Sequence, residues 1–433
     1  MNRLEWTVVA VLAGVTGSGC CTFNPALCKP KYQYVWTQPL NESTHQGFVI
    51  DIERTGSELI AVGATGNRAA KPCYWRSSNG ATWIGPTEAY TGSAQTVGAI
   101  SAVSGRPGGG ELIAVGWSNT PVSGPLVWRY NAQEMSPVGL FTLDGQAHPN
   151  MVPNDAALIP NSPSQDLAVA VGYAFSVPDN KRQAIVIRSQ NNWSTWKEVF
   201  REPIVSTSGG VKCSSEVTAI AAMSGKLAAN GGPAFVAVGY VEIEKSPAAC
   251  LKRGAIWTSA DGTTWKRRMS DFPSEFSTGT WDSQLLSVSA NDVAIYVAGG
   301  DGAAASDTGV KGSMIWQSID KGLKWQRLSD VEPASKQSFP GSHGVTAIRV
   351  GSLPFSYNAA AVGRWNYRSG GFWRGAQGYP LWSGSEVPEI GFQSSARTLS
   401  YTDDVIVVGG TTSNSTGQEQ YPAIWMLSKQ PAN

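Results

Sequence analysis

The sequence predicts an all-β fold made of repeated four-stranded antiparallel sheets. Three observations carry this prediction: the 433 residues include 48 Gly and 17 Trp, an apolar run ending in Val-Gly or a near variant recurs seven times, and an apolar strand containing Trp follows most of these runs. Glycine-rich chains with many β-branched and aromatic residues favour short strands and tight turns. Charged residues make up only 15% of the chain and the formal net charge is +1. We therefore expect no nucleic-acid partner, because such a partner requires a basic stripe.

The repeat has the period of a propeller blade. The glycine-terminated runs end at Gly63, Gly116, Gly172, Gly239, Gly299, Gly363 and Gly409, which are 46 to 67 residues apart. The strand that follows contains Trp75, Trp128, Trp257, Trp316, Trp382 or Trp425, and Ile187 in the third repeat. A period of about 40–60 residues is typical of four-stranded blades around a central channel. The sequence therefore predicts a seven-bladed β-propeller of four-stranded antiparallel blades.

Each blade also needs an innermost strand before its glycine-terminated run, and the chain needs a way to close the ring. The candidate innermost strands are 48–52, 97–103, 155–159, 217–223, 285–289, 345–350 and 398–401. Only eight residues follow Trp425, too few for a good fourth strand in the last blade. We expect residues 34–37 to pair with residues 424–426, because this pairing covers two sheet edges. A separate N-terminal arm is the alternative.

A short turn with a fixed residue pattern follows the Trp strand in several repeats. The copies contain Asp261, Gly262 and Trp265; Asn79, Gly80 and Trp83; and Asp320, Gly322 and Trp325; a degenerate copy runs from Ser189 to Trp196. Asp or Asn caps such a turn with its side chain, Gly takes positive φ, and the Trp ring is buried over the turn. These copies resemble the Asp-box, or BNR, repeat of sialidase-like propellers. The resemblance covers residues 32–428 and implies the fold, but Asp boxes occur in propellers of many activities.

The N-terminal segment predicts export. Residues 6–15 form an apolar run that is too short to span a membrane, which needs about 20 residues, and small residues lead to Cys20 and Cys21. We assign residues 1–21 to a signal peptide and residues 22–433 to one propeller domain. The segment resembles a bacterial lipoprotein leader lipidated at Cys20, which implies attachment to the cell envelope by a lipid anchor. Simple secretion to the periplasm or medium, and a buried first strand, are the alternatives.

The four remaining cysteines, Cys28, Cys73, Cys213 and Cys250, agree with export. They allow three pairings, of which Cys28–Cys73 and Cys213–Cys250 are the local choice; four free thiols are the alternative. No Cys-x-x-Cys motif occurs, so zinc is not expected. We predict no metal site and no cofactor.

The loops between the second and third strands of each blade differ in length and sequence, which is typical of binding loops on a rigid scaffold. They lie on the face opposite the Asp-box turns, so we place the binding surface there or at the channel mouth beneath it. Loop 364–379 combines aromatic rings and guanidinium groups that suit a protein surface or a sugar ring. The candidates are Arg364, Trp365, Tyr367, Arg368, Trp373, Arg374 and Trp117. Packing of these rings on one another is the alternative.

No catalytic pattern is readable. Sialidases resemble one another by an Arg-Ile-Pro motif, three Arg that grip a carboxylate and a Tyr–Glu pair, and no Arg-Ile-Pro occurs here. Asp51, Asp155 and Asp282 form no recognisable acid–nucleophile pair. We expect a monomeric, exported, non-catalytic propeller that binds or scaffolds a protein. A carbohydrate-binding propeller is the first alternative, and a sialidase-like hydrolase, which three Arg around the channel would favour, is the second.

Overall fold

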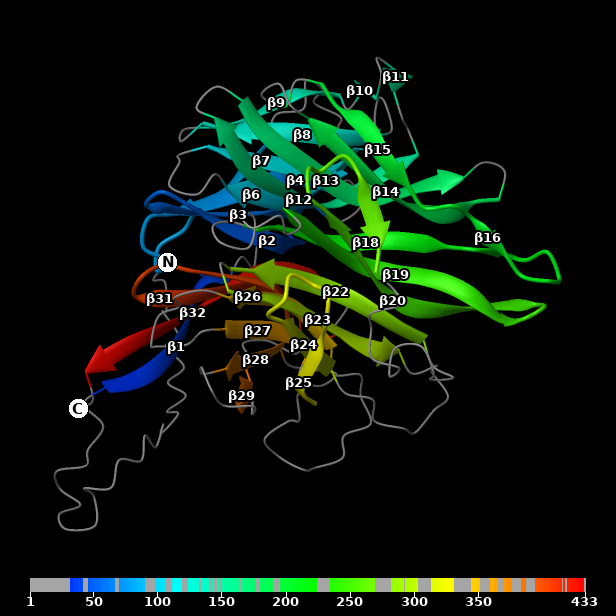
Figure 1. Ribbon diagram of the computed structural model, residues 1–433. Coiled ribbons are helices and arrows are strands. Elements are labelled where there is room, and N and C mark those ends of the chain that lie inside the picture. Colours follow the sequence, from blue (N-terminus) through cyan, green and yellow to red (C-terminus); the bar gives the residue numbers. More distant parts are fainter. Residues whose placement is uncertain are drawn as a thin grey trace, which may run out of the picture.

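The structure is a computed structural model in which the regular elements are strands, β1 to β32 (Figure 1). It describes residues 32–41, 46–66, 70–89, 98–105, 111–118, 124–131, 134–140, 142–143, 146–147, 150–162, 165–176, 179–189, 193, 195–223, 234–268, 282–291, 293–302, 313–330, 344–350, 359–364, 370–375, 383–386, 394–414, 416 and 419–431. Within these ranges, no helix has the length and apolarity needed to cross a bilayer. The signal peptide, Cys20 and Cys28 lie outside the described residues.

Six sheets each consist of four strands that follow one another in the chain and pair antiparallel. The first is β2 (Gly47–Thr55), β3 (Glu58–Thr65), β4 (Lys71–Ser77) and β5 (Ile84–Glu88); the second is β6 (Gly98–Gly105), β7 (Leu112–Ser118), β8 (Gly124–Tyr130) and β9 (Met135–Leu140); the third is β12 (Met151–Ser162), β13 (Gln165–Ser176), β14 (Lys181–Ser189) and β15 (Lys197–Arg201). The fourth is β18 (Ser215–Ala222), β19 (Phe235–Ser246), β20 (Ala249–Ser259) and β21 (Trp265–Arg267); the fifth is β22 (Asp282–Ala290), β23 (Ile295–Gly302), β24 (Ser313–Ser318) and β25 (Gln326–Asp330); the sixth is β26 (Gly344–Val350), β27 (Ala359–Arg364), β28 (Gly370–Gly375) and β29 (Ser383–Glu386).

A further sheet, called the end sheet below, combines both ends of the chain. It consists of β30 (Ser394–Tyr401), β31 (Val405–Ser413), β32 (Gln420–Pro431) and β1 (Tyr32–Asn41). β1 pairs antiparallel with β32, with Tyr34 opposite Lys429 and Thr37 opposite Met426. In Figure 1 the blue β1 lies along the red β32. Residues 34–37 therefore pair with the strand that carries Trp425, as the sequence indicated.

The sheets surround a common channel with their first strands innermost. β2 contacts β6, and contacts continue through β12, β18, β22 and β26 to β30, which contacts β2. The expected propeller of four-stranded antiparallel blades is confirmed. Two short hairpins, β10–β11 (Thr142–Leu143 and Gln146–Ala147) and β16–β17 (Val205–Ser206 and Lys212–Cys213), lie outside these sheets.

The recurring glycine is explained by a β-bulge in every innermost strand. Each first strand shifts register against its second strand just after the residue that pairs with this glycine, for example between Val49 and Asp51, and the same shift recurs in the other six sheets. The strand that bulges brings a carbonyl oxygen against the facing glycine: a Cβ on Gly63 would overlap the oxygen of Phe48, and a Cβ on Gly239 that of Glu216. Only glycine leaves room for this approach.

The register corrects two assignments made from the sequence. In the end sheet, Ala396 pairs with Gly410, and a Cβ on Gly410 would overlap the oxygen of Ser395. The structural equivalent of Gly63 is therefore Gly410, one residue after the Gly409 that the sequence pattern selected. In the sixth sheet, Trp373 pairs with Ala361 as Trp75 pairs with Ala61. Trp373, rather than Trp382, thus holds the repeat position of the third strand.

The tryptophans of the third strands form the centre of the packing between sheets. Trp75, Trp128, Trp257, Trp316 and Trp425 are fully buried. Trp257 packs with Val169, Val171 and Val186 of the preceding sheet. Each ring thus fills the space between neighbouring sheets, where an aromatic side chain buries a large apolar area.

Three turns between the third and fourth strands share one hydrogen-bonding scheme. In the fourth sheet, the Asp261 Oδ1 atom accepts hydrogen bonds from the backbone N–H groups of Thr263 and Thr264 at 2.7 and 2.8 Å, and Trp265 Nε1 donates to the Gly262 oxygen at 3.1 Å. The Thr264 N–H in particular lowers the pKa of Asp261. Asn79, Gly80 and Trp83 repeat the scheme. Asp320, Gly322 and Trp325 do so with one added residue, Lys321, at φ 67°.

The third sheet keeps the ring contact of this turn but not the glycine. Trp196 Nε1 donates to the Trp193 oxygen at 2.9 Å, and Trp193 has φ 65°. Trp193 is 2% exposed. This ring, which lies outside the repeat positions in sequence, is therefore part of the core rather than a binding group.

One of the two expected disulfides is present. Cys213 and Cys250 are bridged, with their Cα atoms 5.8 Å apart. The predicted bridge of Cys73 is wrong, because Cys73 carries a free, buried thiol. Its side chain packs in the core with Leu40, Val49 and Trp75, and burial strongly raises the pKa of this thiol.

The glycine constraint makes a direct prediction. Replacing Gly239 with Ala should lower the free energy of unfolding by about 1–3 kcal/mol, because the new methyl group overlaps a backbone oxygen that the bulge fixes in place. Urea unfolding followed by tryptophan fluorescence measures this change. The control is Ala260→Ser on the exposed turn of the same sheet, which should shift stability by less than about 0.5 kcal/mol. Equal stability of Gly239→Ala and the parent protein would contradict the packing explanation.

Candidate functional site

The central channel contains a polar cavity of about 1040 Å³. It is lined by the later halves of the seven innermost strands, from the bulge onward, and extends to Gly56 in the turn after β2. We call the face that carries the turns between first and second strands, and between third and fourth strands, the turn face. The opposite face is called the loop face. The cavity therefore occupies the half of the channel toward the turn face, whereas the sequence placed the binding surface on the loop face or its channel mouth.

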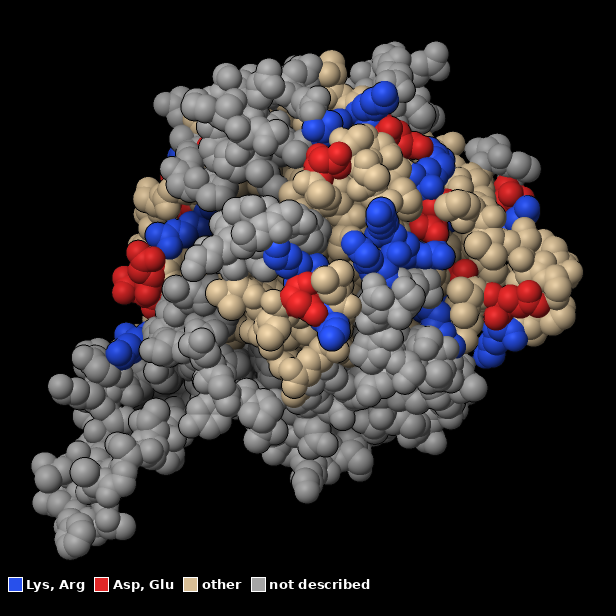
Figure 2. Space-filling view, viewed as in Figure 1, with Lys and Arg blue, Asp and Glu red and all other residues tan. Residues whose placement is uncertain are grey.

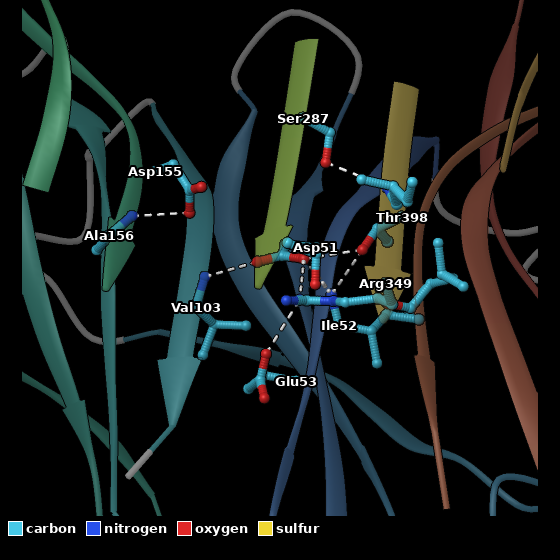
Figure 3. A network of polar contacts seen from close by, with 12 residues as sticks. Asp51, Ile52, Glu53, Val103, Asp155, Ala156, Ser287, Arg349 and Thr398 are labelled. Atoms are coloured by element: carbon cyan, nitrogen blue, oxygen red, sulfur yellow. Dashed lines mark hydrogen bonds and ion pairs between the residues drawn. The ribbon is translucent and has the colours of Figure 1, made fainter. Parts of the chain in front are cut away.

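Asp51 joins three sheets. Its Oδ1 atom accepts hydrogen bonds from the Ile52 N–H at 2.8 Å and from the Thr398 hydroxyl of β30 at 2.8 Å. Its Oδ2 atom accepts from the Val103 N–H of β6 at 3.0 Å. Figure 3 shows these contacts converging on the carboxylate. Asp51 follows the bulge residue of β2, so the bulge turns this side chain toward the channel and the neighbouring strands.

Asp155 has the equivalent position in the third sheet. Its Oδ1 atom accepts from the Ala156 N–H at 2.7 Å, and its Oδ2 atom accepts from the Ile220 N–H of β18 at 2.8 Å. Burial is the main cause that raises the pKa of Asp155 to about 7, and the nearby charge of Asp51 adds to it. Near neutral pH this carboxyl group therefore exists in both protonation states.

Hydroxyl groups make the same kind of contact elsewhere around the channel. The Ser287 hydroxyl accepts a hydrogen bond from the Ile348 N–H of the next sheet at 3.1 Å. The Thr218 hydroxyl donates to the Leu285 oxygen at 2.7 Å, and the Thr346 hydroxyl donates to the Ala396 oxygen at 3.0 Å. Polar side chains at or just after the bulges therefore tie neighbouring innermost strands together.

Arg349 is the central cation of the channel. Its Nη2 atom lies 3.0 Å from the Glu53 carboxylate and 3.8 Å from the Asp51 carboxylate, and its Nε atom donates to the Leu399 oxygen at 3.2 Å. Burial raises the pKa of Glu53, the charge of Arg349 opposes this rise, and the charge of Asp51 adds to it. Figure 3 shows the guanidinium group of Arg349 among Asp51, Glu53 and Ile52. No sequence pattern indicates this cluster, because Arg349 and Glu53 are almost 300 residues apart.

Three arginines line the cavity, which is the arrangement that would favour a sialidase. They do not share a target. Arg349 is paired with Glu53, and Arg54 contacts Asp403 at 3.0 Å. Arg397 lies over the Phe48 ring, with its guanidinium carbon 5.4 Å from the ring centroid. Each guanidinium group is therefore engaged separately. In the described part of the chain, no group of three or more His, Cys, Asp or Glu side chains could hold a metal ion.

Most of the predicted binding loop lies outside the described residues, including Trp365, Tyr367 and Arg368. The backbone of Arg364 ends β27, and the backbones of Trp373 and Arg374 lie in β28 rather than in a loop. Trp117 is half-buried at the end of β7, opposite Ala99 and Pro125. The structure therefore does not bring these candidates together as one described site, and their binding role stays a prediction.

The loop face carries a different cluster that the sequence did not single out. We call it the hairpin surface, and it is formed by the extended ends of the β13–β14 and β19–β20 hairpins. The Glu216 carboxylate receives hydrogen bonds there from Arg182 at 2.6 Å, Tyr240 at 3.2 Å and Asn154 at 2.9 Å. Arg182 lies 4.5 Å from the centroid of the Tyr173 ring. Tyr173 contacts Phe175 edge to face, and Lys252 lies over Tyr240 at 4.3 Å.

A bridged segment, residues 203–214, supports this surface from the side. The disulfide joins its Cys213 to Cys250 of the β19–β20 hairpin. The Thr207 hydroxyl donates to the Pro247 oxygen at 2.6 Å, and the Ser208 hydroxyl donates to Glu244 at 2.7 Å. In Figure 1 the hairpin that contains β16 and the β19–β20 hairpin project from the side of the molecule. The disulfide and side-chain hydrogen bonds thus hold a projecting element in place.

Charges on the molecular surface are of mixed sign. On the side shown in Figure 2, the described Lys and Arg side chains alternate with Asp and Glu in small groups. Such a surface gives no extended positive field for a polyanion.

Comparisons with known proteins give similarity of fold only. No family model matches the chain, and no curated protein matches its sequence. A protein of unknown function from Dyadobacter fermentans is 13% identical, with a TM-score of 0.46 over 93% of this chain and 100% of that one. A Trypanosoma rangeli sialidase is 14% identical, with a TM-score of 0.43 over 90% of this chain and 57% of that one. A Penicillium chrysogenum α-L-arabinanase is 12% identical, with a TM-score of 0.43 over 74% and 90% of the two chains.

The raised pKa of Asp155 predicts how stability changes with pH. A carboxyl group whose pKa rises from 3.8 to about 7 on folding stabilises the fold below pH 4, and this contribution is lost as pH rises to 7. At about 1.4 kcal/mol per pKa unit, the loss is at most about 4 kcal/mol, and partial exposure to channel water reduces it. Asp155→Asn should therefore gain stability relative to the parent protein between pH 5 and pH 8.

Denaturant unfolding at several pH values measures this difference. The control is Asp403→Asn: its exposed carboxylate has a pKa lowered by Arg54, so it is ionised in both the folded and the unfolded state above pH 5. The stability difference of this control should stay constant over the same range. A constant difference for Asp155→Asn as well would contradict the environment derived for Asp155.

Proposed function

We propose that the protein is an exported, non-catalytic, seven-bladed propeller that binds a protein partner through its loop face. In this proposal the six consecutive sheets and the end sheet are the seven blades, β1 closes the ring, and the turns at Asp261, Asn79 and Asp320 are Asp boxes. The segment 1–21 is the export signal, with Cys20 as the site of lipidation or, in the secreted form, part of the leader. The Cys213–Cys250 disulfide is compatible with export, because structural disulfides persist in oxidising compartments.

The observation that carries the proposal is the contrast between the channel and the hairpin surface. In the channel, the carboxylates of Asp51 and Asp155 accept hydrogen bonds from backbone N–H groups of neighbouring sheets. On the loop face, aromatic and guanidinium groups gather on a braced projection that the sheets themselves do not require. Tyr and Arg on a rigid surface are the groups that anchor protein partners most often.

The same contacts favour a protein partner over a glycan. Stacking on a sugar ring needs an open aromatic face, and Arg182 already lies over Tyr173 while Lys252 lies over Tyr240. Tyr240 is also only 4% exposed. Binding of glycans on a glycan array that Phe175→Ala abolishes would favour the carbohydrate-binding alternative instead.

Site-specific cross-linking tests the partner surface. A photoreactive amino acid at Phe175, on the hairpin surface, should give a discrete protein adduct in the cells that produce the protein, and one at the exposed Thr263 on the turn face should not. The pair Tyr173→Ala and Phe175→Ala should weaken binding of the captured partner at least about tenfold. Adducts that are identical at both positions, or unchanged binding by the double variant, would contradict the proposal.

A glycoside hydrolase is the second candidate, favoured by one observation. Asp51 and Asp155 line one cavity, and a carboxyl group such as that of Asp155, whose pKa burial raises to about 7, is suited to proton transfer. We expect no turnover of fluorogenic sialosides or arabinofuranosides between pH 5 and pH 8. Turnover that Asp155→Asn abolishes, while the variant stays folded, would overturn the non-catalytic assignment.

A further inference from the structure

Exposed apolar side chains concentrate on the turn face. The described residues include five exposed large hydrophobic side chains, and four of them lie on this face: Ile84, Val293, Ile319 and Leu323, which are 58%, 70%, 71% and 53% exposed. The fifth, Val205, is in the β16–β17 hairpin. Ile84 begins β5, directly after the turn of the first sheet. Val293, Ile319 and Leu323 belong to the two turns of the fifth sheet.

The repeats provide an internal comparison for these positions. Ile319 and Leu323 occupy the places that Ser78 and Ala81 hold in the first sheet and that Ala260 and Thr263 hold in the fourth. Val293 occupies the place of Ser57 in the first sheet and of Asp404 in the end sheet. The described copies compared here therefore have small or polar residues where the fifth sheet has large aliphatic ones.

The turns do not need these aliphatic side chains. The turn after β24 is held by the Ser318 hydroxyl, the Asp320 carboxylate and the Trp325 ring nitrogen. The turn after β22 is held by Asn291, whose Oδ1 atom accepts from the N–H groups of Val293 and Ala294 at 2.9 and 2.8 Å. The two turns are neighbours, because Gly322 faces the Ile295 side chain at the start of β23. Exposed aliphatic groups at one place, with no role in the fold, mark a contact surface.

The course of β1 indicates what lies beyond this surface. β32 runs from the β31–β32 hairpin on the loop face toward the turn face, and β1 pairs with it antiparallel, with Tyr32 opposite Pro431. β1 therefore begins at the turn face. Cys20 precedes Tyr32 by twelve residues, which span at most about 40 Å when fully extended. A chain anchored at Cys20 would thus hold the turn face, and not the loop face, toward the membrane.

We propose that the turn face rests on the lipid surface and that Val293, Ile319 and Leu323 insert between lipid headgroups, with Ile84 as a separate contact. This inference rests on the export signal of the proposed function but not on the partner surface. Aliphatic side chains at turn tips gain free energy when they leave water for the headgroup and acyl boundary. The turn face would supply a contact with the lipid in addition to the anchor at Cys20. The loop face would then point away from the membrane, toward partners.

The test uses the full-length chain with vesicles of phosphatidylethanolamine and phosphatidylglycerol in equal amounts. Hydrogen exchange followed by mass spectrometry should show backbone exchange slowed at least about threefold in peptides covering residues 289–295 and 317–325. Peptides covering residues 240–254 on the loop face should not change. Equal exchange of all these peptides with and without vesicles would overturn the proposal, even if the leader alone tethers the chain to the vesicle.

A matched set of variants isolates the side chains. The triple variant Val293→Ser, Ile319→Ser and Leu323→Thr carries the residues of the other repeats, so it should fold with the same unfolding midpoint. It should lose the slowed exchange and bind vesicles at least about tenfold more weakly. The control is Ser57→Ala, Ala260→Ser and Thr263→Ser, which changes the equivalent positions without adding or removing large apolar groups. This control should bind like the parent chain.

Two other results would show that lipid is not what contacts the turn face. If light scattering shows that the triple variant converts a dimer of the parent chain to a monomer, the surface is a contact between copies and the lipid proposal fails. If the triple variant keeps vesicle binding and slowed exchange, the aliphatic side chains are not the contact and the proposal also fails. Cross-linking at Phe175 reads out the partner surface separately, so either proposal can fail without the other.

Discussion

The close approach of a carbonyl oxygen to a glycine determines the shape of the innermost strands, on which the rest of the structure depends. At the recurring glycine of each sheet the innermost strand carries one extra residue. In six sheets this bulge is seen to bring a backbone oxygen against the glycine, whose Cα carries no side chain. The bulge gives every innermost strand an irregular point at the same height around the channel. Side chains that follow it, such as Asp51 and Asp155, turn from their own sheet toward the next one. A packing rule of the backbone thus determines where the polar chemistry of the channel lies.

This arrangement explains how the charged side chains of the channel are held in place. Asp51 and Asp155 accept hydrogen bonds from the backbone of neighbouring sheets, and Arg349 is held by Glu53 and the Leu399 oxygen. These hydrogen bonds and ion pairs hold the innermost strands of neighbouring sheets in register and hold the Asp51 and Asp155 carboxylates in defined positions. Burial, to which the nearby charge of Asp51 adds, raises the pKa of Asp155 to about 7. The loop face has the opposite character, since its hairpins extend beyond what the sheets need and are braced by a disulfide.

Local patterns in the sequence were sufficient for the sheets, the turns and the pairing of residues 34–37, because each depends on residues close together in the repeat. They were insufficient where the outcome depends on a neighbouring sheet. Gly409 and Gly410 are indistinguishable by pattern, and only the register with Ala396 selects Gly410. Trp373 looked like a loop residue because the strand that contains it starts earlier than its spacing suggests. Cys73 looked like a disulfide partner, but its place in the strand turns its side chain into the core. Arg349 and Glu53 meet only because the ring brings distant strands together.

The pairing of β1 with β32 affects how the protein folds during synthesis. Among the described strands, the first in the sequence, β1, has the last, β32, as its partner. Until β32 has been synthesised, Tyr32–Asn41 has no strand to pair with, and the end sheet stays incomplete. The end sheet therefore depends on contacts of very long sequence separation, which form later in folding than contacts within one sheet. Loss of β32 would therefore expose two strand edges, that of β1 and that of β31.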